Sequence, residues 1–266
     1  MSKNLQPVVL CLSGLDPSGG AGIQADIETL ASLGCHCAPI ITTLTVQDSC
    51  NVTELSCVDP AFITRQMAVI FADMKVSAIK IGLLGSTGVT QAIAAVLEKH
   101  PNIPVIIDPV LKASGGTELA NQRVIESIRQ HLLPKTSVIT PNADEAQKLS
   151  PHPSNDDAHL AQYFHSQGCQ YLLITGGDSP ADASHSNVTN TLYCAGQPPL
   201  AHHWPRLAGS FHGSGCTLAA AVSAFIALGD AMPEAVYKAQ QYTHGTLKNA
   251  QALGEGALIP IRVPAQ

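Results

Sequence analysis

The chain has 266 residues, of which 45% are hydrophobic and 13% are charged, and its formal net charge is −6 at pH 7. This length and apolar content suit a compact globular enzyme with a substantial core, and they argue against a disordered chain. The negative charge, without a block of Lys and Arg, argues against nucleic acid or an anionic membrane as a partner, but a local cluster could still bind a small anion.

The N-terminal region and the cysteines bear on where the protein resides. The apolar stretch from Val8 to Leu12 is too short for the core of a signal peptide, and no run approaches the roughly 18 residues of a membrane span. The eight cysteines are too sparse for a disulfide scaffold. We therefore expect a cytoplasmic protein with reduced thiols.

Short β-branched runs alternate with helical patterns along the chain. The predicted strands are residues 8–13, 37–44, 78–83, 105–107, 137–140, 171–175 and 191–194. The predicted helices are residues 21–33, 62–74, 87–100, 121–131, 214–228 and 233–249, and the polar segment 178–190 is predicted to be a loop. This alternation predicts a single α/β domain over residues 1–266, with a mostly parallel central sheet and helices on both faces. Ligands of such sheets bind beyond the carboxyl ends of the strands.

The first predicted strand ends in a glycine-rich loop whose last part, Gly20 to Ala25, fits the pattern G-x-G-x-x-A. Between a strand and a helix, this pattern is compatible with a dinucleotide site. Against that interpretation, Asp16 puts a carboxylate in a long turn, and Gln47 stands where an acidic ribose-binding residue is expected. The alternative is that the glycines only allow the chain to turn sharply.

Two polar side chains could recognise a heterocycle. Asp26 lies on the helix after the glycine-rich loop, and Gln47 follows the next strand, so the two could meet above the sheet edge. A carboxylate and a carboxamide together offer donors and acceptors suited to the edge of an aminopyrimidine. The alternative is that Asp26 caps or solvates the first turns of its helix.

Further polar residues follow the fourth and fifth predicted strands. Asp108 follows the fourth, and Asn142 and Glu145 lie in Thr-Pro-Asn-x-x-Glu after the fifth. One or two carboxylates acting with nucleotide phosphates suit Mg²⁺. The spacing of Asn142 and Glu145 is equally typical of a helix cap. Because the chain has no Walker A motif, the phosphates of ATP would have to rest on another loop and helix start.

Such a helix start is predicted at residue 214, where Gly213 and Gly215 lie in the segment His-Gly-Ser-Gly-Cys-Thr (212–217). The first amides of a helix lack partners and carry partial positive charge, and glycine lets a phosphate approach the backbone. The segment therefore predicts an anion site that could stabilise a transferring phosphoryl group. The alternative is a glycine-rich turn before a buried helix.

Five motifs in chain order are Ser-Gly-Leu-Asp-Pro-Ser-Gly-Gly-Ala-Gly-Ile-Gln-Ala-Asp (13–26), Thr-Leu-Thr-Val-Gln-Asp (43–48), Ile-Asp-Pro-Val (107–110), Thr-Pro-Asn-x-x-Glu (140–145) and His-Gly-Ser-Gly-Cys-Thr (212–217). Together they resemble the hydroxymethylpyrimidine/phosphomethylpyrimidine kinases of thiamine biosynthesis, within the ribokinase-like superfamily. The resemblance implies a three-layer ribokinase-like fold. It also implies that Mg·ATP phosphorylates 4-amino-5-hydroxymethyl-2-methylpyrimidine and then its monophosphate, at one site.

The resemblance also implies roles for individual residues. Substrate contacts fall to Ala21, Asp26, Gln47 and Val110, nucleotide contacts to Asn142, Thr175, Gly177 and Thr217, and metal contacts to Asp108 and Glu145. The anion hole and catalytic group fall to Gly213, Ser214, Gly215 and Cys216. Most ribokinase-like sugar kinases have an Asp base where this chain has Cys216. A thiol at a helix start could have a lowered pKa and take a proton, or it could only donate to the anion.

The chain departs from the family pattern at two positions. Thr175 stands where relatives commonly have a lysine, and Asn190 stands where they have an aspartate. Without that lysine, a cation that would balance nucleotide phosphates is missing, and Lys112 could make the contact instead. The alternatives are a pyridoxal kinase, although Gln47 and Asp26 favour the aminopyrimidine, and a non-catalytic pyrimidine-binding protein. Family precedent also implies a homodimer.

Overall fold

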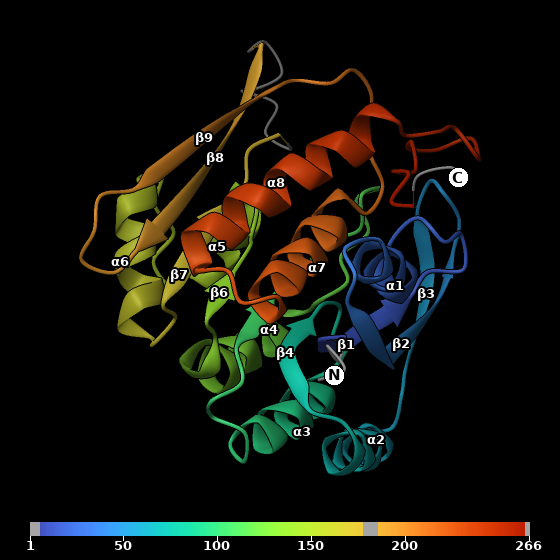
Figure 1. Ribbon diagram of the computed structural model, residues 1–266, viewed down its shortest axis with the longest axis vertical. Helices are drawn as coiled ribbons and strands as arrows, with labels where there is room; N and C mark the ends of the chain where they lie inside the picture. The colour runs from blue at the N-terminus through green and yellow to red at the C-terminus, as the bar shows by residue number, and fades with distance from the viewer. Residues whose placement is uncertain (1–5, 178–185, 264–266) are drawn as a thin grey trace, which may run out of the picture.

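A computed structural model describes residues 6–177 and 186–263, and within them nine strands form one sheet (Figure 1). The strands are β1 Val8–Leu15, β2 His36–Gln47, β3 Val52–Cys57, β4 Val76–Ile81, β5 Val105–Ile107, β6 Val138–Ile139, β7 Tyr171–Ile174, β8 Asn187–Cys194 and β9 Leu200–Pro205. Their order across the sheet is β3-β2-β1-β4-β5-β6-β7-β8-β9.

The centre of the sheet is parallel and its two edges are antiparallel. Strands β2, β1, β4, β5, β6 and β7 pair in parallel, whereas β3 pairs antiparallel with β2, and β8 and β9 continue antiparallel from β7. The chain order reverses at β1, because β2 lies on one side of it and β4 on the other. A crevice outside the carboxyl end of β1 is therefore expected to hold the ligand.

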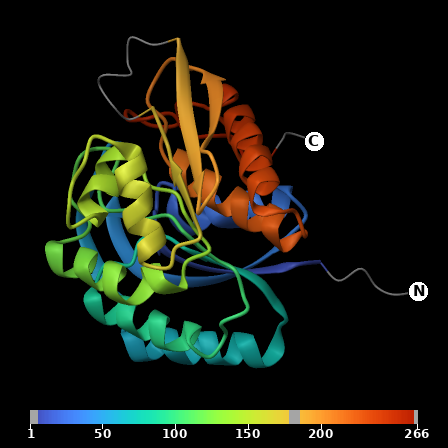
Figure 2. The same ribbon diagram turned by 90° about the vertical axis from the view of Figure 1, so that its left-hand side faces the viewer.

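Helices cover both faces of the sheet, which confirms the predicted three-layer α/β architecture (Figure 2). One face carries α1 Gly22–Ser32, α7 Ser214–Ala227 and α8 Met232–Lys248. The other face carries α2 Pro60–Asp73, α3 Thr87–Leu97, α4 Gln122–Ser127, α5 Ala143–Leu149 and α6 Asp157–Ser166. After α4, the chain continues as a short π-helix, Ile128–Leu132, and a 3₁₀ turn, Leu133–Lys135.

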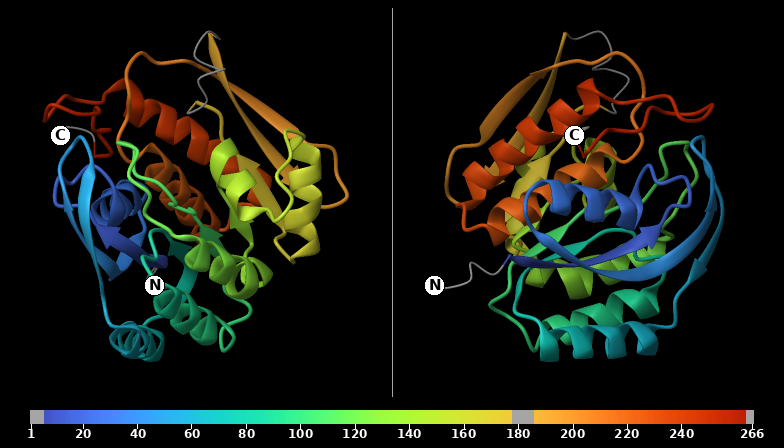
Figure 3. Two further views of the ribbon diagram at one scale, coloured as in Figure 1. Left: turned by 180° about the vertical axis from the view of Figure 1, so that it is seen from behind. Right: turned by 45° about the vertical axis from the view of Figure 1, so that its right-hand side comes forward.

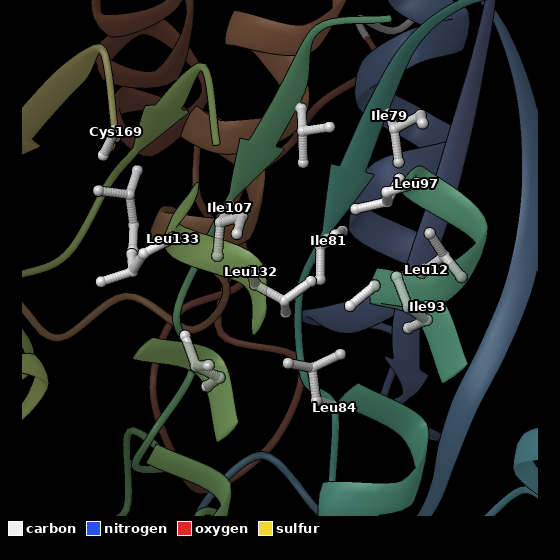
Figure 4. Close-up of a cluster of buried hydrophobic side chains, with 14 of the residues drawn as sticks. Leu12, Ile79, Ile81, Leu84, Ile93, Leu97, Ile107, Leu132, Leu133 and Cys169 are labelled. Atoms are coloured by element: carbon white, nitrogen blue, oxygen red, sulfur yellow. The ribbon is translucent and has the colours of Figure 1, made fainter. Parts of the chain in front are cut away.

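Strand β1 shows why the central strands are apolar on both sides. Leu10 and Leu12 point into the core under α3 and α4, whereas Val9 and Cys11 point into the core under α1 and α7. Figure 4 shows the first of these cores, where strand residues such as Leu12 meet helical residues such as Ile93. Burying each such side chain contributes about 1.5–3 kcal/mol. A strand buried on both faces therefore carries no alternation of polar residues.

The edges of the sheet differ most from the sequence prediction. Strands β3 and β9 were not predicted, because most of their residues are exposed or half-buried and show no apolar run. Strand β8 begins at residue 187 rather than 191, because Thr189 and Asn190 pair with β9. Residues 187–190 of the predicted loop are therefore strand, and residues 178–185 lie outside the described part. Figure 3 shows β3 and the β8–β9 pair at opposite ends of the sheet.

Two helices were also missed. Helix α5 is short, and helix α6 buries only Leu160, Ala161 and Phe164, so neither gives a strong apolar period. Within the described residues, none of the helices combines the length and the apolar character needed to cross a bilayer.

Candidate active site

A cleft of about 750 Å³ lies at the carboxyl ends of the parallel strands. Its volume suits a small-molecule ligand. Twelve of the fourteen predicted site residues line it: Ala21, Gln47, Asp108, Val110, Asn142, Glu145, Thr175, Gly177, Gly213, Ser214, Gly215 and Cys216. The two exceptions are Asp26 and Thr217, whose side chains are completely buried.

The start of α7 forms the middle of the cleft. Its N-cap residue Gly213 has a φ of 76° and makes no side-chain cap. A Cβ at Gly213 would lie 2.1 Å from the backbone oxygen of Gly20, so only glycine fits there. Because no side chain caps this helix, its first amides are available to an anion in the cleft.

Cys216 and Asp108 meet beside this helix start. Both are almost completely buried, the Cys216 thiol hydrogen-bonds the Asp108 carboxylate, and the Gly22 amide hydrogen-bonds the Cys216 sulfur. Burial and the neighbouring Asp108 raise the pKa of Cys216 far above its usual range. The prediction of a lowered pKa is therefore wrong for this structure, because burial and the carboxylate outweigh the helix start. The geometry favours the alternative, a protonated thiol that donates a hydrogen bond.

The carboxylates on this side of the cleft differ in how their oxygens are used. Asp108 Oδ2 is buried and has no hydrogen-bond partner among the described residues, and burial raises the pKa of this carboxyl group. Glu145 accepts hydrogen bonds from the amides of Leu111 and Asn142, at 3.2 and 3.1 Å. Asn142 in turn accepts from the Glu145 amide at 2.9 Å, which completes a capping box. The predicted cap is therefore confirmed, and the open oxygen of Asp108 fits a hard cation such as Mg²⁺.

His212 connects the loops at the end of the cleft that contains Gln47. Its Nε2 atom lies 2.7 Å from Asp16 Oδ2 and 3.0 Å from the Gln47 amide nitrogen, and its Nδ1 lies 3.1 Å from the Ser114 hydroxyl. A Cβ at Gly20 would lie 2.2 Å from the His212 ring. Gly20 therefore leaves room for the His212 ring. This packing accounts for a glycine at position 20 without a bound dinucleotide. Sequence reasoning gave His212 no role, because its partners lie far away in the chain.

Asp26 does not reach the cleft, contrary to the expectation that it and Gln47 meet there. Its carboxylate forms an ion pair with Lys80 at 2.9 Å and accepts a hydrogen bond from Ser13 at 2.6 Å. Burial alone would lower the pKa of Lys80, but the Asp26 carboxylate outweighs burial and raises it. A buried lysine needs such a partner. The signal that could have indicated this pair is a lysine inside the apolar run of β4.

Thr217 is also turned away from the cleft. Its hydroxyl donates to the Gly213 carbonyl at 2.8 Å and accepts from Arg262 Nε at 2.8 Å. Arg262 itself is 1% exposed and forms an ion pair with Glu28. The role predicted for Thr217 in nucleotide contact is therefore not supported, because its hydroxyl ties α7 to the C-terminal segment.

The opposite end of the cleft is built by β7, β8, β9 and α8. The Asn190 side chain accepts from the Gly176 amide at 3.0 Å and donates to Gln240 at 2.9 Å. Arg206 donates to the Gly177 carbonyl at 3.3 Å and lines the cleft, as Lys112 does from the other side. Sequence reasoning missed Arg206, because it follows a strand that was itself missed.

Comparisons with known proteins agree with this geometry. The family model for phosphomethylpyrimidine kinase matches residues 16–261. The chain is 35% identical over 252 residues to the hydroxymethylpyrimidine/phosphomethylpyrimidine kinase of Salmonella typhimurium, covering 93% of each chain. It is 33% identical to a thiamine biosynthesis bifunctional protein of Geobacter sulfurreducens, covering 93% of this chain and 50% of that protein.

A solved structure shows the same architecture. The pyridoxal kinase of Bacillus subtilis in an ADP complex superposes with a TM-score of 0.86 at 29% identity, covering 97% of each chain. The family model spans most of the chain, and the motif residues that it covers converge on one cleft. The chain belongs to the phosphomethylpyrimidine kinase family, within the ribokinase-like fold.

Proposed function

We propose that this protein uses ATP to phosphorylate 4-amino-5-hydroxymethyl-2-methylpyrimidine and then phosphorylates the monophosphate to the diphosphate. The observation that carries the proposal is the joining of two features in one cleft, the uncapped start of α7 and the hydrogen-bonding group of Gln47 and His212. The first suits a phosphoryl group, and the second suits the polar edge of a heterocycle. Relatives named for this activity support the assignment.

The residues of the α7 start would act mainly through electrostatics. Phosphoryl transfer needs little covalent work from the protein, so positioning and stabilisation of charge dominate. The amides of residues 213–216 would receive the charge of the transferring group, and the Cys216 thiol would add a donor. Asp108, with Glu145 nearby, would hold Mg²⁺, which neutralises phosphate charge when bound. Ala21 and Val110 would form the walls of the substrate site.

The nucleotide would occupy the end of the cleft lined by Asn142, Thr175 and Gly177. Thr175 cannot supply the positive charge of the lysine that relatives commonly have there. Arg206 beside Gly177, together with Lys112, would supply it.

The remaining expectations also belong to this proposal. We infer that residues 1–266 act as one domain, in the cytoplasm and as a homodimer that binds neither nucleic acid nor membranes. Support for the dimer comes from β2, next to the edge strand β3, where Leu44 and Val46 are 45% and 57% exposed. Exposed apolar side chains on neighbouring positions suit contact with a second copy. Light scattering during gel filtration tests this inference, and a monomer at micromolar concentration would contradict it.

A second candidate is a pyridoxal kinase, because the fold is close to that of the Bacillus subtilis enzyme of that name. The deciding experiment measures ADP release from Mg·ATP with the hydroxymethylpyrimidine, its monophosphate and pyridoxal in parallel, and identifies the products by mass. Two phosphorylations of the pyrimidine are expected. Turnover of pyridoxal alone would favour the second candidate. No turnover with any of the three, together with pyrimidine binding by calorimetry, would indicate a non-catalytic binding protein.

A further inference from the structure

The hydrogen bonds around Asp16 determine the state of its neighbour His212. Asp16 Oδ1 accepts from the amide and the hydroxyl of Ser18, and Oδ2 accepts from the Ala21 amide, all at 2.7–2.8 Å. Hydrogen bonds from His212 and Ser18 outweigh burial and lower the pKa of Asp16. Asp16 is therefore a carboxylate that can only accept, so the His212 Nε2 atom at 2.7 Å must carry the proton.

The proton on His212 Nε2 decides how the carboxamide of Gln47 is oriented. The carboxamide nitrogen of Gln47 lies 3.0 Å from His212 Nε2, which would set two N–H donors against each other. The oxygen and nitrogen ends of a carboxamide have nearly the same shape, so their neighbours decide which end lies where. Rotating the carboxamide by half a turn removes this donor–donor contact and lets its oxygen share the His212 proton with the Asp16 carboxylate.

The contacts of Thr45 are compatible with the same orientation. The Thr45 hydroxyl donates its single proton to the Leu15 carbonyl at 2.8 Å. Its oxygen lies 3.1 Å from the other end of the Gln47 carboxamide and can accept a hydrogen bond from that end when the NH₂ group lies there. The proton on His212 thus places the NH₂ group of Gln47 on the Thr45 side, where the Thr45 oxygen can accept from it. One of its two protons satisfies Thr45, and the other is available to the cleft.

We propose that Gln47 presents an N–H rather than a carbonyl to the cleft, held so by the positioning residues His212 and Asp16. This end of the cleft then reads a hydrogen-bond acceptor, which in an aminopyrimidine is a ring nitrogen and not the amino group. The inference rests on the proposed function for the identity of the ligand. The orientation of Gln47 and the proton on His212 depend only on the protein.

The first test examines the free protein. Nitrogen-15 NMR of the histidine rings distinguishes a proton on Nε2 from one on Nδ1, and a His212→Gln sample assigns the signal. A proton on Nε2 is expected for His212 at neutral pH. A neutral ring protonated on Nδ1 would overturn the proposal, whatever substrate the enzyme uses.

The second test examines recognition by calorimetry. The ligands are the hydroxymethylpyrimidine and its two aminopyridine analogues, each with one ring nitrogen replaced by CH. We expect the wild type to bind one analogue about tenfold more weakly or worse, because a donor is left unpaired. The isosteric variant Gln47→Glu offers only acceptors, so it should bind the pyrimidine weakly and lose this discrimination. Equal or tighter binding of the pyrimidine by Gln47→Glu would overturn the proposal.

A matched pair of variants tests His212 as a positioning residue. His212→Gln keeps an N–H donor near the Nε2 position, whereas His212→Met keeps volume without a donor. We expect His212→Met to raise the KM for the pyrimidine about tenfold and to lose discrimination between the ligands, with kcat and the KM for ATP little changed. His212→Gln should retain the discrimination. Loss of stability with unchanged discrimination in His212→Met would show a structural role only.

A wrong substrate assignment can be distinguished from a wrong orientation of Gln47. If the wild type phosphorylates pyridoxal and not the pyrimidine, the substrate assignment is wrong. The comparison of wild type with Gln47→Glu on pyridoxal, together with the NMR result, then decides the orientation of Gln47.

Discussion

Helices α5 and α7 both begin at the cleft, yet their first turns are completed in opposite ways. Helix α5 starts with a capping box in which Asn142 and Glu145 satisfy each other's amides. Helix α7 starts at Gly213 without a side-chain cap. The first arrangement holds a carboxylate at the rim of the cleft, and the second leaves donors open. The cleft therefore has one helix start that its own side chains close and one whose amides are open to an anion.

The start of α1 lies between these two cases. Its N-cap residue Ala21 has no side-chain cap of its own, but its amide donates to the Asp16 carboxylate five residues earlier. That carboxylate also holds His212. The carboxylate that completes this helix start therefore also positions a residue that lines the cleft.

The largest effect is expected from placing a negative charge at the open start of α7. A Cβ at Gly215 would lie 3.5 Å from Asp108 Oδ1, which is an ordinary contact, so the backbone there accepts a Cβ. Gly215→Asp should lower kcat/KM by more than about 100-fold, because it repels the phosphoryl group where amides should stabilise it. The isosteric Gly215→Asn should lose much less. Similar losses in both variants at equal thermal stability would contradict an anion site here.

A smaller effect is expected at Cys216. Because burial and Asp108 raise the pKa of its thiol, Cys216 should act as a donor and not as a base. Cys216→Ala should lower kcat by about tenfold to 100-fold, with the KM for both substrates little changed. Cys216→Ser keeps a donor and should retain more activity than the alanine variant. Wild-type kcat in Cys216→Ala, measured at saturating Mg·ATP, would show that the thiol has no role.

The contrast between the two helix starts can be measured as stability. Asn142→Ala removes the cap of α5 and should lower the free energy of unfolding by about 1 kcal/mol. Ser214→Ala changes the first residue of α7, a helix that no side chain caps. This variant should lower the free energy of unfolding by much less. Urea unfolding monitored by circular dichroism gives both values. Equal losses would mean that the α7 start is also capped by a side chain.

The smallest effect concerns Asp16 at acid pH. Since the folded protein lowers the pKa of this carboxyl group, the ionised form stabilises the fold above the unfolded pKa of about 3.9. This contribution is lost as the pH falls through the lower, folded pKa. Asp16→Asn should therefore weaken the pH dependence of the unfolding free energy below about pH 5. An unchanged slope in denaturant titrations at a series of pH values would refute the assignment.

Local patterns were sufficient for much of the fold, and together with the family resemblance they pointed to twelve residues of the cleft. The apolar runs of the central strands and the amphipathic helices predicted a three-layer α/β fold, because residues buried by neighbouring layers must be apolar. The glycines at 213 and 215 predicted an open helix start, which the structure contains. The spacing of Asn142 and Glu145 indicated a helix cap as one of two interpretations, and that cap is observed.

Edge elements could not be predicted in the same way. Strands β3 and β9 exist because partner strands offer free hydrogen-bonding groups, and a partner is not a property of the segment itself. Arg206 follows β9, so it was missed together with that strand. The sequence showed that Thr175 stands where relatives commonly have a lysine. It did not show that Arg206 lies nearby.

The chain alone thus determined the layers of the fold, the open start of α7 and twelve of the residues that line the cleft. These features depend on residue type and on short spacings, which burial and backbone geometry impose locally. Only the tertiary structure decided that Asp26 pairs with the buried Lys80, that Thr217 ties down Arg262, and that His212 bonds to Asp16 and Gln47. Each of these pairs joins groups far apart in sequence, and a buried charge or donor is satisfied by whichever partner the packing brings within reach.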